Sequence, residues 1–246
     1  MALIPSLPMA SIFPIPHQVP SARIRQAYVN MNTDAVNPTR GASIEDIHNR
    51  LSKRATTNTF IDSLWNNPSN QDLVSGFLNN NFSLTCAHGN DTECLPLYQK
   101  FSVQDYFYLE DYVKFKALRL NTLPVGDLRT VQSEAASIYD DANSAISFAE
   151  SYVTELQGKA TDLAEGNREV PELAYSNLLQ SSATKEDWFN LHVIEIPCVY
   201  ETAFLDANVA EWQSEIDTIN GTGKWNNLFR TALKVEIAMF DSAFDQ

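Results

Sequence analysis

The stretch 127–157, DLRTVQSEAASIYDDANSAISFAESYVTELQ, decides the fold class of this 246-residue chain. Its apolar side chains recur at intervals of three and four residues, which is the spacing of one face of an α-helix. They are Leu128, Val131, Ala135, Ile138, Ala142, Ala145, Phe148, Tyr152 and Leu156. No glycine or proline interrupts the stretch. We therefore predict one long helix here, with its apolar stripe packed against a core.

Other parts of the chain show the same periodicity. The segment 101–120 is apolar with few charges and should form a helix buried on several sides. A last helix is marked by Phe229, Leu233, Ile237, Phe240 and Phe244. Only eight glycines occur, fewer than the turns of an all-β sandwich or barrel require. The prediction is an all-α protein with one helical domain over 43–246.

Local signals divide the chain further. Residues 1–42 hold six of the eleven prolines and no helical period, so we expect an irregular N-terminal arm. Ser43 with Asp46 is typical of a helix start, and Thr184 with Asp187 is a second candidate cap. Pro171 suits the first turn of a helix.

The net charge of −14 disfavours nucleic acid and anionic membrane surfaces as partners, because both are bound through Lys and Arg clusters. No apolar run approaches the roughly 20 residues that span a bilayer, and no basic segment precedes the first apolar stretch. We therefore expect a cytoplasmic protein, and leave open whether it forms a homo-oligomer. Of three cysteines, Cys86 and Cys94 flank a short loop and can pair if oxidised.

A first group of polar residues lies within 101–120. Asp105 and Tyr108 are separated by three residues and Tyr112 follows one turn later, so all three share a helix face. A carboxylate among aromatic rings is desolvated and tends to keep its proton, which suits recognition of a nitrogen heterocycle. The alternative is a core carboxylate bonded to tyrosine hydroxyls, and the sequence does not decide between the two.

A second group surrounds Pro197. Glu195 and Cys198 are separated by three residues, and Tyr200 and Thr202 follow. We expect Pro197 to kink a helix and free a backbone carbonyl beside a pocket. An acidic neighbour opposes formation of the reactive thiolate, and a buried structural cysteine is the more common outcome for a lone Cys.

Metal and nucleotide cofactors find little support. His192 and Glu195 have the spacing of ligands in a carboxylate-bridged metal site, but the other histidines, His17, His48 and His88, lie in the arm, near a helix start and in a loop. We therefore expect no metal. No glycine-rich phosphate loop, paired-cysteine motif or nucleophile elbow is present, so no cofactor is expected.

Taken together, these two groups resemble the TenA (thiaminase II) family, helical proteins of the haem-oxygenase-like fold. FSVQDYFYLEDYVKFKAL (101–118) is similar to the family helix with a QD-x-x-Y-L pattern, and NLHVIEIPCVYETAF (190–204) to the helix with an L-P-C motif. TNTFIDSLW (57–65) resembles the opening helix, and Trp212 with FRTALKVEIAMFD (229–241) a later one. The resemblance implies that Asp105 and Tyr108 hold a substrate ring and that Cys198 attacks it.

The sequence also departs from the family. Thr202 stands where the family has a tyrosine, and Lys224 or Trp225 lies in the region of a second pocket tyrosine. The family's catalytic glutamate belongs to one more helix, and the chain ends at Gln246, so we assign no counterpart of that glutamate. Loss of a proton donor costs typically ~10²–10⁴-fold in rate.

Three functions remain. The first is a repurposed TenA-like enzyme that cyclises, isomerises or hydrolyses a compact, largely apolar small molecule. Asp105 would be its acid or base, in a cavity shaped by Tyr108, Tyr112, Tyr200 and Trp225, with Glu195 and Thr202 beside it. The second is a thiaminase-type C–N hydrolase with Cys198 as nucleophile. The third is a binding or regulatory protein without chemistry. We rank the first highest, because the aspartate is present and the hydrolytic partners are not.

Overall fold

The computed structural model describes residues 60–88, 91–123, 126–198 and 223–244, and every regular element within these ranges is helical. This confirms the all-α prediction. The arm over 1–42 and the predicted helix start at Ser43 lie outside the described residues. The elements are α3 (Phe60–Trp65), the 3₁₀ helix η1 (Pro68–Asn70), α4 (Gln71–Leu78), α5 (Asn81–His88), α6 (Asp91–Leu120), α7 (Leu128–Thr154), α8 (Ala160–Glu165), α9 (Val170–Ala183), α10 (Trp188–Glu195) and α13 (Lys224–Ser242).

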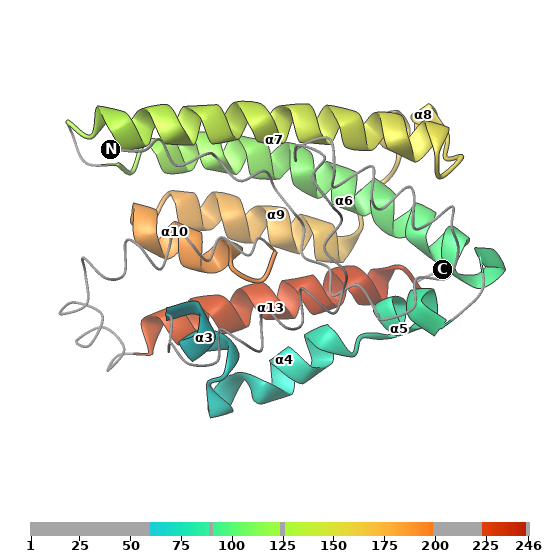
Figure 1. Ribbon diagram of the computed structural model, residues 1–246, viewed down its shortest axis with the longest axis horizontal. Coiled ribbons are helices and arrows are strands. Elements are labelled where there is room, and N and C mark those ends of the chain that lie inside the picture. The colour runs from blue at the N-terminus through green and yellow to red at the C-terminus, as the bar shows by residue number, and fades with distance from the viewer. Residues whose placement is uncertain (1–59, 89–90, 124–125, 199–222, 245–246) are drawn as a thin grey trace, which may run out of the picture.

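The helices are arranged in layers (Figure 1). Helix α7 lies at one side of the molecule and α6 runs beside it, α9 and α10 form the middle, and α13 lies below them with α3, α4 and α5. Helix α6 packs against α7 and α9, and α13 packs against α9, α10 and α4. Within the described residues, no helix is both long and apolar enough to cross a membrane.

Aromatic side chains fill the space between the layers. The stripe predicted for the last helix is buried at Phe229, Leu233 and Phe240, whereas Phe244 lies beyond the end of α13 and is exposed. The ring of Phe240 stacks on Phe82 of α5 and Phe101 of α6, with centroids 5.8 and 5.5 Å apart. Burial of such large rings supplies much of the free energy that holds α13 against α5 and α6.

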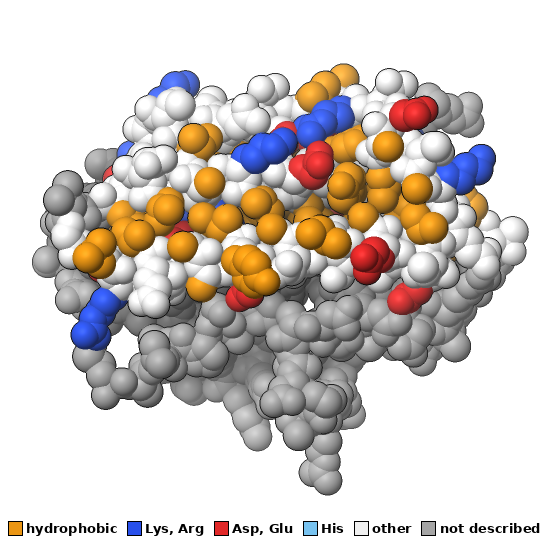
Figure 2. Space-filling model, turned by 90° about the horizontal axis from the view of Figure 1, so that it is seen from above, with side chains coloured by type: hydrophobic (Ala, Val, Ile, Leu, Met, Phe, Trp, Pro, Cys, Tyr) orange, Lys and Arg blue, Asp and Glu red, His pale blue; other side chains and the backbone are white. Residues whose placement is uncertain are grey.

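The predicted long helix is confirmed as α7. Asp127 caps it by accepting a hydrogen bond from the backbone nitrogen of Thr130 at 3.1 Å. Its apolar stripe is packed against the core only in part. Ala145 and Tyr152 are buried, but Leu128 is 76% exposed. Figure 2, which looks onto this side of the molecule, shows hydrophobic side chains along the exposed face.

The turn signals around α9 and α10 are partly confirmed. Pro171 lies in the first turn of α9, as predicted, and Thr184 ends that helix. Asp187 caps α10 through the backbone nitrogen of Asn190, at 2.8 Å. The prediction that Pro197 kinks a helix from inside is wrong, because α10 ends at Glu195. Ile196 still has helical dihedral angles, but Pro197 has no backbone N–H to donate to the preceding turn, so the helical hydrogen bonds end there.

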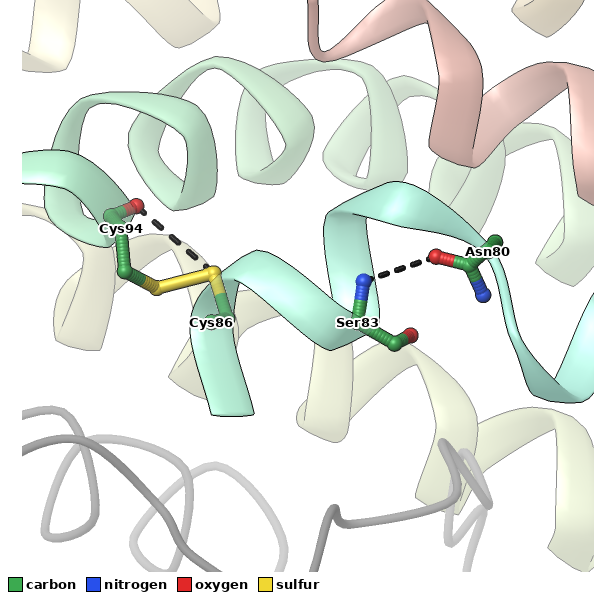
Figure 3. The surroundings of a disulfide bond; sticks show 4 residues. All are labelled: Asn80, Ser83, Cys86 and Cys94. Atoms are coloured by element: carbon green, nitrogen blue, oxygen red, sulfur yellow. Dashed lines mark hydrogen bonds between the residues drawn. A yellow bond between two sulfur atoms is a disulfide. The ribbon is translucent and has the colours of Figure 1, made fainter. Parts of the chain in front are cut away.

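A disulfide joins Cys86, in α5, to Cys94, in the first turn of α6 (Figure 3). The pairing that the sequence allows is therefore present. The side chain of Asn80 accepts a hydrogen bond from the backbone nitrogen of Ser83 at 2.7 Å and so caps α5. The disulfide therefore holds the end of α5 against the start of α6, and the cap fixes where α5 begins.

Candidate functional site

Five titratable side chains from distant parts of the chain meet at the centre of the protein, and we call them the acid–thiol cluster. Its members are Asp105 and Tyr108 of α6, Tyr175 of α9, Cys198 just after α10, and Glu236 of α13. The Tyr175 hydroxyl donates a hydrogen bond to Glu236 Oε1 at 2.7 Å. The rings of Tyr108 and Tyr175 are in contact, with centroids 4.5 Å apart.

Local helical geometry explains how each element supplies its member. Asp105 and Tyr108 are three residues apart, so they share the face of α6 that is turned toward the core. Tyr175 is fully buried on α9. Glu236 lies three residues after Leu233 and four before Phe240, on the buried stripe of α13. The apolar neighbours that anchor each helix therefore also carry these polar side chains into the core.

Burial raises the pKa values of both carboxyl groups of the cluster. It brings the pKa of Asp105 to about 8, with a further contribution from the negative charge of Glu236. It brings the pKa of Glu236 to about 7, although hydrogen bonds from Tyr175 and Cys198 partly oppose the shift. Near neutral pH, Asp105 is therefore mostly protonated while Glu236 is divided between acid and carboxylate. Two carboxyl groups poised in this way can serve as proton donor and proton acceptor.

The thiol and the phenols of the cluster are held in their neutral forms. Burial raises the pKa of Cys198 well above its ordinary value, and the negative charges of Glu236, Asp105 and Glu195 add to the effect. Burial likewise raises the pKa values of Tyr108 and Tyr175. Cys198 is a free thiol, as the sequence predicted, and not part of a disulfide. As the site stands, the sulfur becomes a nucleophile only if a neighbour takes its proton.

Two members of the cluster have unused hydrogen-bonding capacity. Among the described residues, the buried Tyr108 hydroxyl has no hydrogen-bond partner of ordinary geometry, although it lies close enough to Cys198 and Tyr175 to lower the pKa of each. The Asp105 carboxyl, also buried, forms no hydrogen bond or ion pair with any residue in the described ranges. Buried polar groups are nearly always partnered, so the unused capacity of the Tyr108 hydroxyl, three residues from Asp105 on α6, is available to a ligand.

Two other predicted site residues, Tyr112 and Glu195, belong to a neighbouring ion-pair network. Glu195 Oε1 pairs with Arg119, and Glu195 Oε2 accepts a hydrogen bond from the Tyr112 hydroxyl at 3.0 Å. Arg119 Nη2 also contacts Glu134 Oε2 at 2.7 Å, and Arg119 Nη1 lies 3.1 Å from His192 Nδ1. Burial alone would raise the pKa of Glu134, but His192 and Arg119 hold it at about 2. Both oxygens of Glu195 are thus engaged by protein groups.

The remaining predicted residues do not join the cluster. Trp225 donates from Nε1 to Asn190 Oδ1 at 2.7 Å, and its ring packs on Phe60 and Phe189. It is eleven residues from Glu236 on α13, or about 16 Å along the helix axis. Trp225 is therefore part of the core at the other end of α13. Tyr200 and Thr202 lie outside the described residues.

The sequence reasoning missed Glu236 and Tyr175. It placed Glu195 beside the substrate and assigned no catalytic glutamate, whereas the structure brings Glu236 next to Cys198. A signal for Glu236 was present, because it is a charged residue in the middle of an apolar stripe, between Leu233 and Phe240. Lone charges on a buried helix face are costly and often functional. Tyr175 carried no comparable signal.

Comparison with known proteins does not place the chain in a family. No protein-family model matches it, and no curated protein sequence is significantly similar to it. Among the described residues, no three His, Cys, Asp or Glu side chains are grouped as metal binding requires. The geometry of the acid–thiol cluster and the motif resemblance therefore carry the evidence about function.

Proposed function

We propose that this protein is a TenA-like enzyme that carries out acid–base chemistry on a compact, largely apolar small molecule, without a cofactor. One observation supports this most directly. The buried, unpartnered carboxyl of Asp105 lies beside Glu236, and both groups titrate near neutral pH. A purely structural carboxylate would be paired, as Glu195 is in the neighbouring network.

The two carboxyl groups would divide the proton transfers between them. A polar atom of the substrate would accept a hydrogen bond from protonated Asp105, with the Tyr108 hydroxyl as a second contact. Asp105 would give its proton to one atom of the substrate, and ionised Glu236 would remove a proton from another. The substrate gains one proton and loses one, so the step balances as an isomerisation or cyclisation. General acid–base catalysis of this kind contributes typically ~10²–10⁴-fold in rate.

A second candidate is hydrolysis of a C–N bond through a covalent intermediate, as the resemblance to TenA implies. The hydrogen bond between Cys198 and Glu236 favours it. Glu236 would take the thiol proton while the sulfur attacks an electrophilic ring carbon, and that proton would then pass to the departing amine. Water would release the product and restore the thiol. This route uses the same Glu236 but makes Cys198 indispensable.

Single substitutions separate the two candidates once a substrate is found. A thermal-shift screen of aminopyrimidines against terpenoid and polyketide-like compounds would identify ligands, because binding to the folded state raises its stability. With a turned-over ligand, Asp105→Asn and Glu236→Gln should each lower kcat by roughly a hundredfold or more. Cys198→Ala should be mild in the acid–base enzyme and as severe as Glu236→Gln in the covalent hydrolase.

The pH dependence gives an independent test. Activity requires ionised Glu236 and protonated Asp105, so kcat/KM should follow a narrow bell with limbs near about 7 and about 8. Asp111→Asn is the matched control, since Asp111 lies on the same helix but is paired with Arg168. Its bell should match that of the wild type. Unaltered turnover in both Asp105→Asn and Glu236→Gln would refute the proposal.

A further inference from the structure

The exposed face of α7 has the pattern of a helix that pairs with another helix. Its apolar and small residues are spaced alternately by four and three, which is the heptad repeat of a coiled-coil seam. The seam residues are Leu128, Ala135, Tyr139, Ala142, Ile146, Ala149 and Val153, with Gln132 at the one polar position. The repeat extends over nearly four heptads, long enough to be significant.

The large side chains of this seam point away from the core. The exposed fractions are 76% for Leu128, 69% for Tyr139, 59% for Ile146 and 38% for Val153. Figure 2, which looks onto this side of the molecule, shows a band of hydrophobic side chains there. The opposite face of α7 carries Glu134 and Asp141, which are buried in ion pairs with α6. A soluble protein seldom exposes a continuous apolar band of this length unless it is an interaction surface.

From this pattern we propose that the seam on α7 pairs with the same seam of a second copy, antiparallel, to form a symmetric dimer. When two copies of a helix pair antiparallel, the numbers of any two seam residues that face each other add up to the same total. A two-fold axis between Asp140 and Asp141 joins Tyr139 to Ala142 and Ala135 to Ile146. Tyr139 and Ile146 then each face an alanine, and Leu128 faces Val153. The seam is therefore complementary to itself in this register, as an isologous interface requires.

Charge complementarity favours the same arrangement. Arg129 and Glu150 are exposed residues that flank the seam on one side, near its two ends. In the antiparallel register Arg129 of one copy comes opposite Glu150 of the other, twice per dimer. In a parallel pair residues of equal number lie at the same level, so Arg129 would be 21 residues, or about 32 Å, from Glu150 of the other copy and could not pair with it. The surface thus fits a second copy of this chain in one orientation.

The first test is the association state, measured by sedimentation equilibrium at micromolar concentrations of the full chain. The wild type should be a dimer. Ile146→Glu, which places a charge in the seam of both copies, should raise the dimer Kd by roughly a hundredfold or more. Val170→Glu is the matched control, because Val170 is 79% exposed but lies on α9. That variant should remain dimeric.

The second test fixes the register. A chain carrying both Ala135→Cys and Ile146→Cys should form a disulfide-linked dimer on mild oxidation. Either substitution alone should not, because identical residues would be offset by eleven positions, or about 16 Å. A monomeric wild type, or a dimer that survives Ile146→Glu, would overturn the proposal. Cross-linking of either single variant would overturn the antiparallel register.

Discussion

Replacing Asp105 by asparagine should make the protein more stable at neutral pH, although it should also abolish activity. Asparagine has nearly the same shape, and Asp105 forms no hydrogen bond or ion pair with the described residues that the change could break. What the change removes is a carboxyl group that folding forces to keep its proton, since burial raises its pKa from 3.8 to about 8. Below pH 3.8 the carboxyl is neutral in both states and costs nothing. As the pH rises toward 8 the unfolded chain is increasingly favoured.

The magnitude follows from the pKa difference. The pH of 7 lies about three units above the pKa of this carboxyl in the unfolded chain, and each unit corresponds to about 1.4 kcal/mol. The free energy by which the carboxyl destabilises the folded protein at pH 7 is therefore at most about 4 kcal/mol. For a chain of this size 1 kcal/mol moves the melting temperature by roughly 2–4 °C. The Asp105→Asn protein should therefore melt higher than the wild type at pH 7, by at most roughly 8–16 °C. The difference should vanish near pH 4.

The assay is thermal denaturation followed by circular dichroism from pH 4 to pH 8, which also checks the predominantly helical spectrum. Asp111→Asn is the control variant, for which we expect the melting temperature to change in the opposite direction. Burial raises the pKa of Asp111, but hydrogen bonds from Arg168 and Lys114 outweigh burial and lower it. Asp111→Asn should therefore destabilise the protein at pH 7, and less so as the pH falls. If Asp105→Asn melted below the wild type at pH 7, or differed from it equally at all pH values, Asp105 would be a structural carboxylate with partners.

Three further changes test the packing of the fold. Asp141→Ala leaves the Lys116 ammonium, which is 1% exposed, without its ion-pair partner, and should lower the free energy of unfolding by about 3–5 kcal/mol, measurable by urea denaturation. Gly158→Ala places a methyl group against the Tyr152 ring, with only 2.1 Å between the new carbon and the nearest ring atom, so the melting temperature should fall. An unchanged melting temperature would show that the turn adjusts freely. Reduction of the disulfide between α5 and α6 should cost about 2 kcal/mol, because it closes a short loop, and the comparison is melting with and without reductant.

Much of the helical architecture could be predicted because its signals are local. Helix α7 follows from apolar spacing, and its first residue from the cap at Asp127. Pro171 correctly marked the start of α9, and Cys86 with Cys94 marked a covalent link across one loop. The error at Pro197 had a local cause as well. The apolar pattern continues past Glu195, but the proline prevents the helix from following it.

The candidate site could be predicted only in part, since its members come from four separate segments. The sequence indicated Asp105, Tyr108 and Cys198 by their motifs, but it treated Glu195 as a neighbour of the substrate. In the structure Glu195 forms an ion pair with the buried Arg119, and Glu236 from the last helix lies beside the thiol of Cys198. Such pairings depend on which helix faces lie against each other, and no local pattern records that.

The sequence by itself determined the helices, because hydrophobic periodicity, caps and prolines act within a few residues of one another. The heptad spacing on α7 is likewise a property of one helix. Only the tertiary structure decided which side of α7 faces outward, because α6 covers the side that carries Glu134 and Asp141. The packing of α6, α9 and α13 likewise decided that Asp105 and Glu236 share one buried site, where their desolvation raises both pKa values into the range that acid–base chemistry uses.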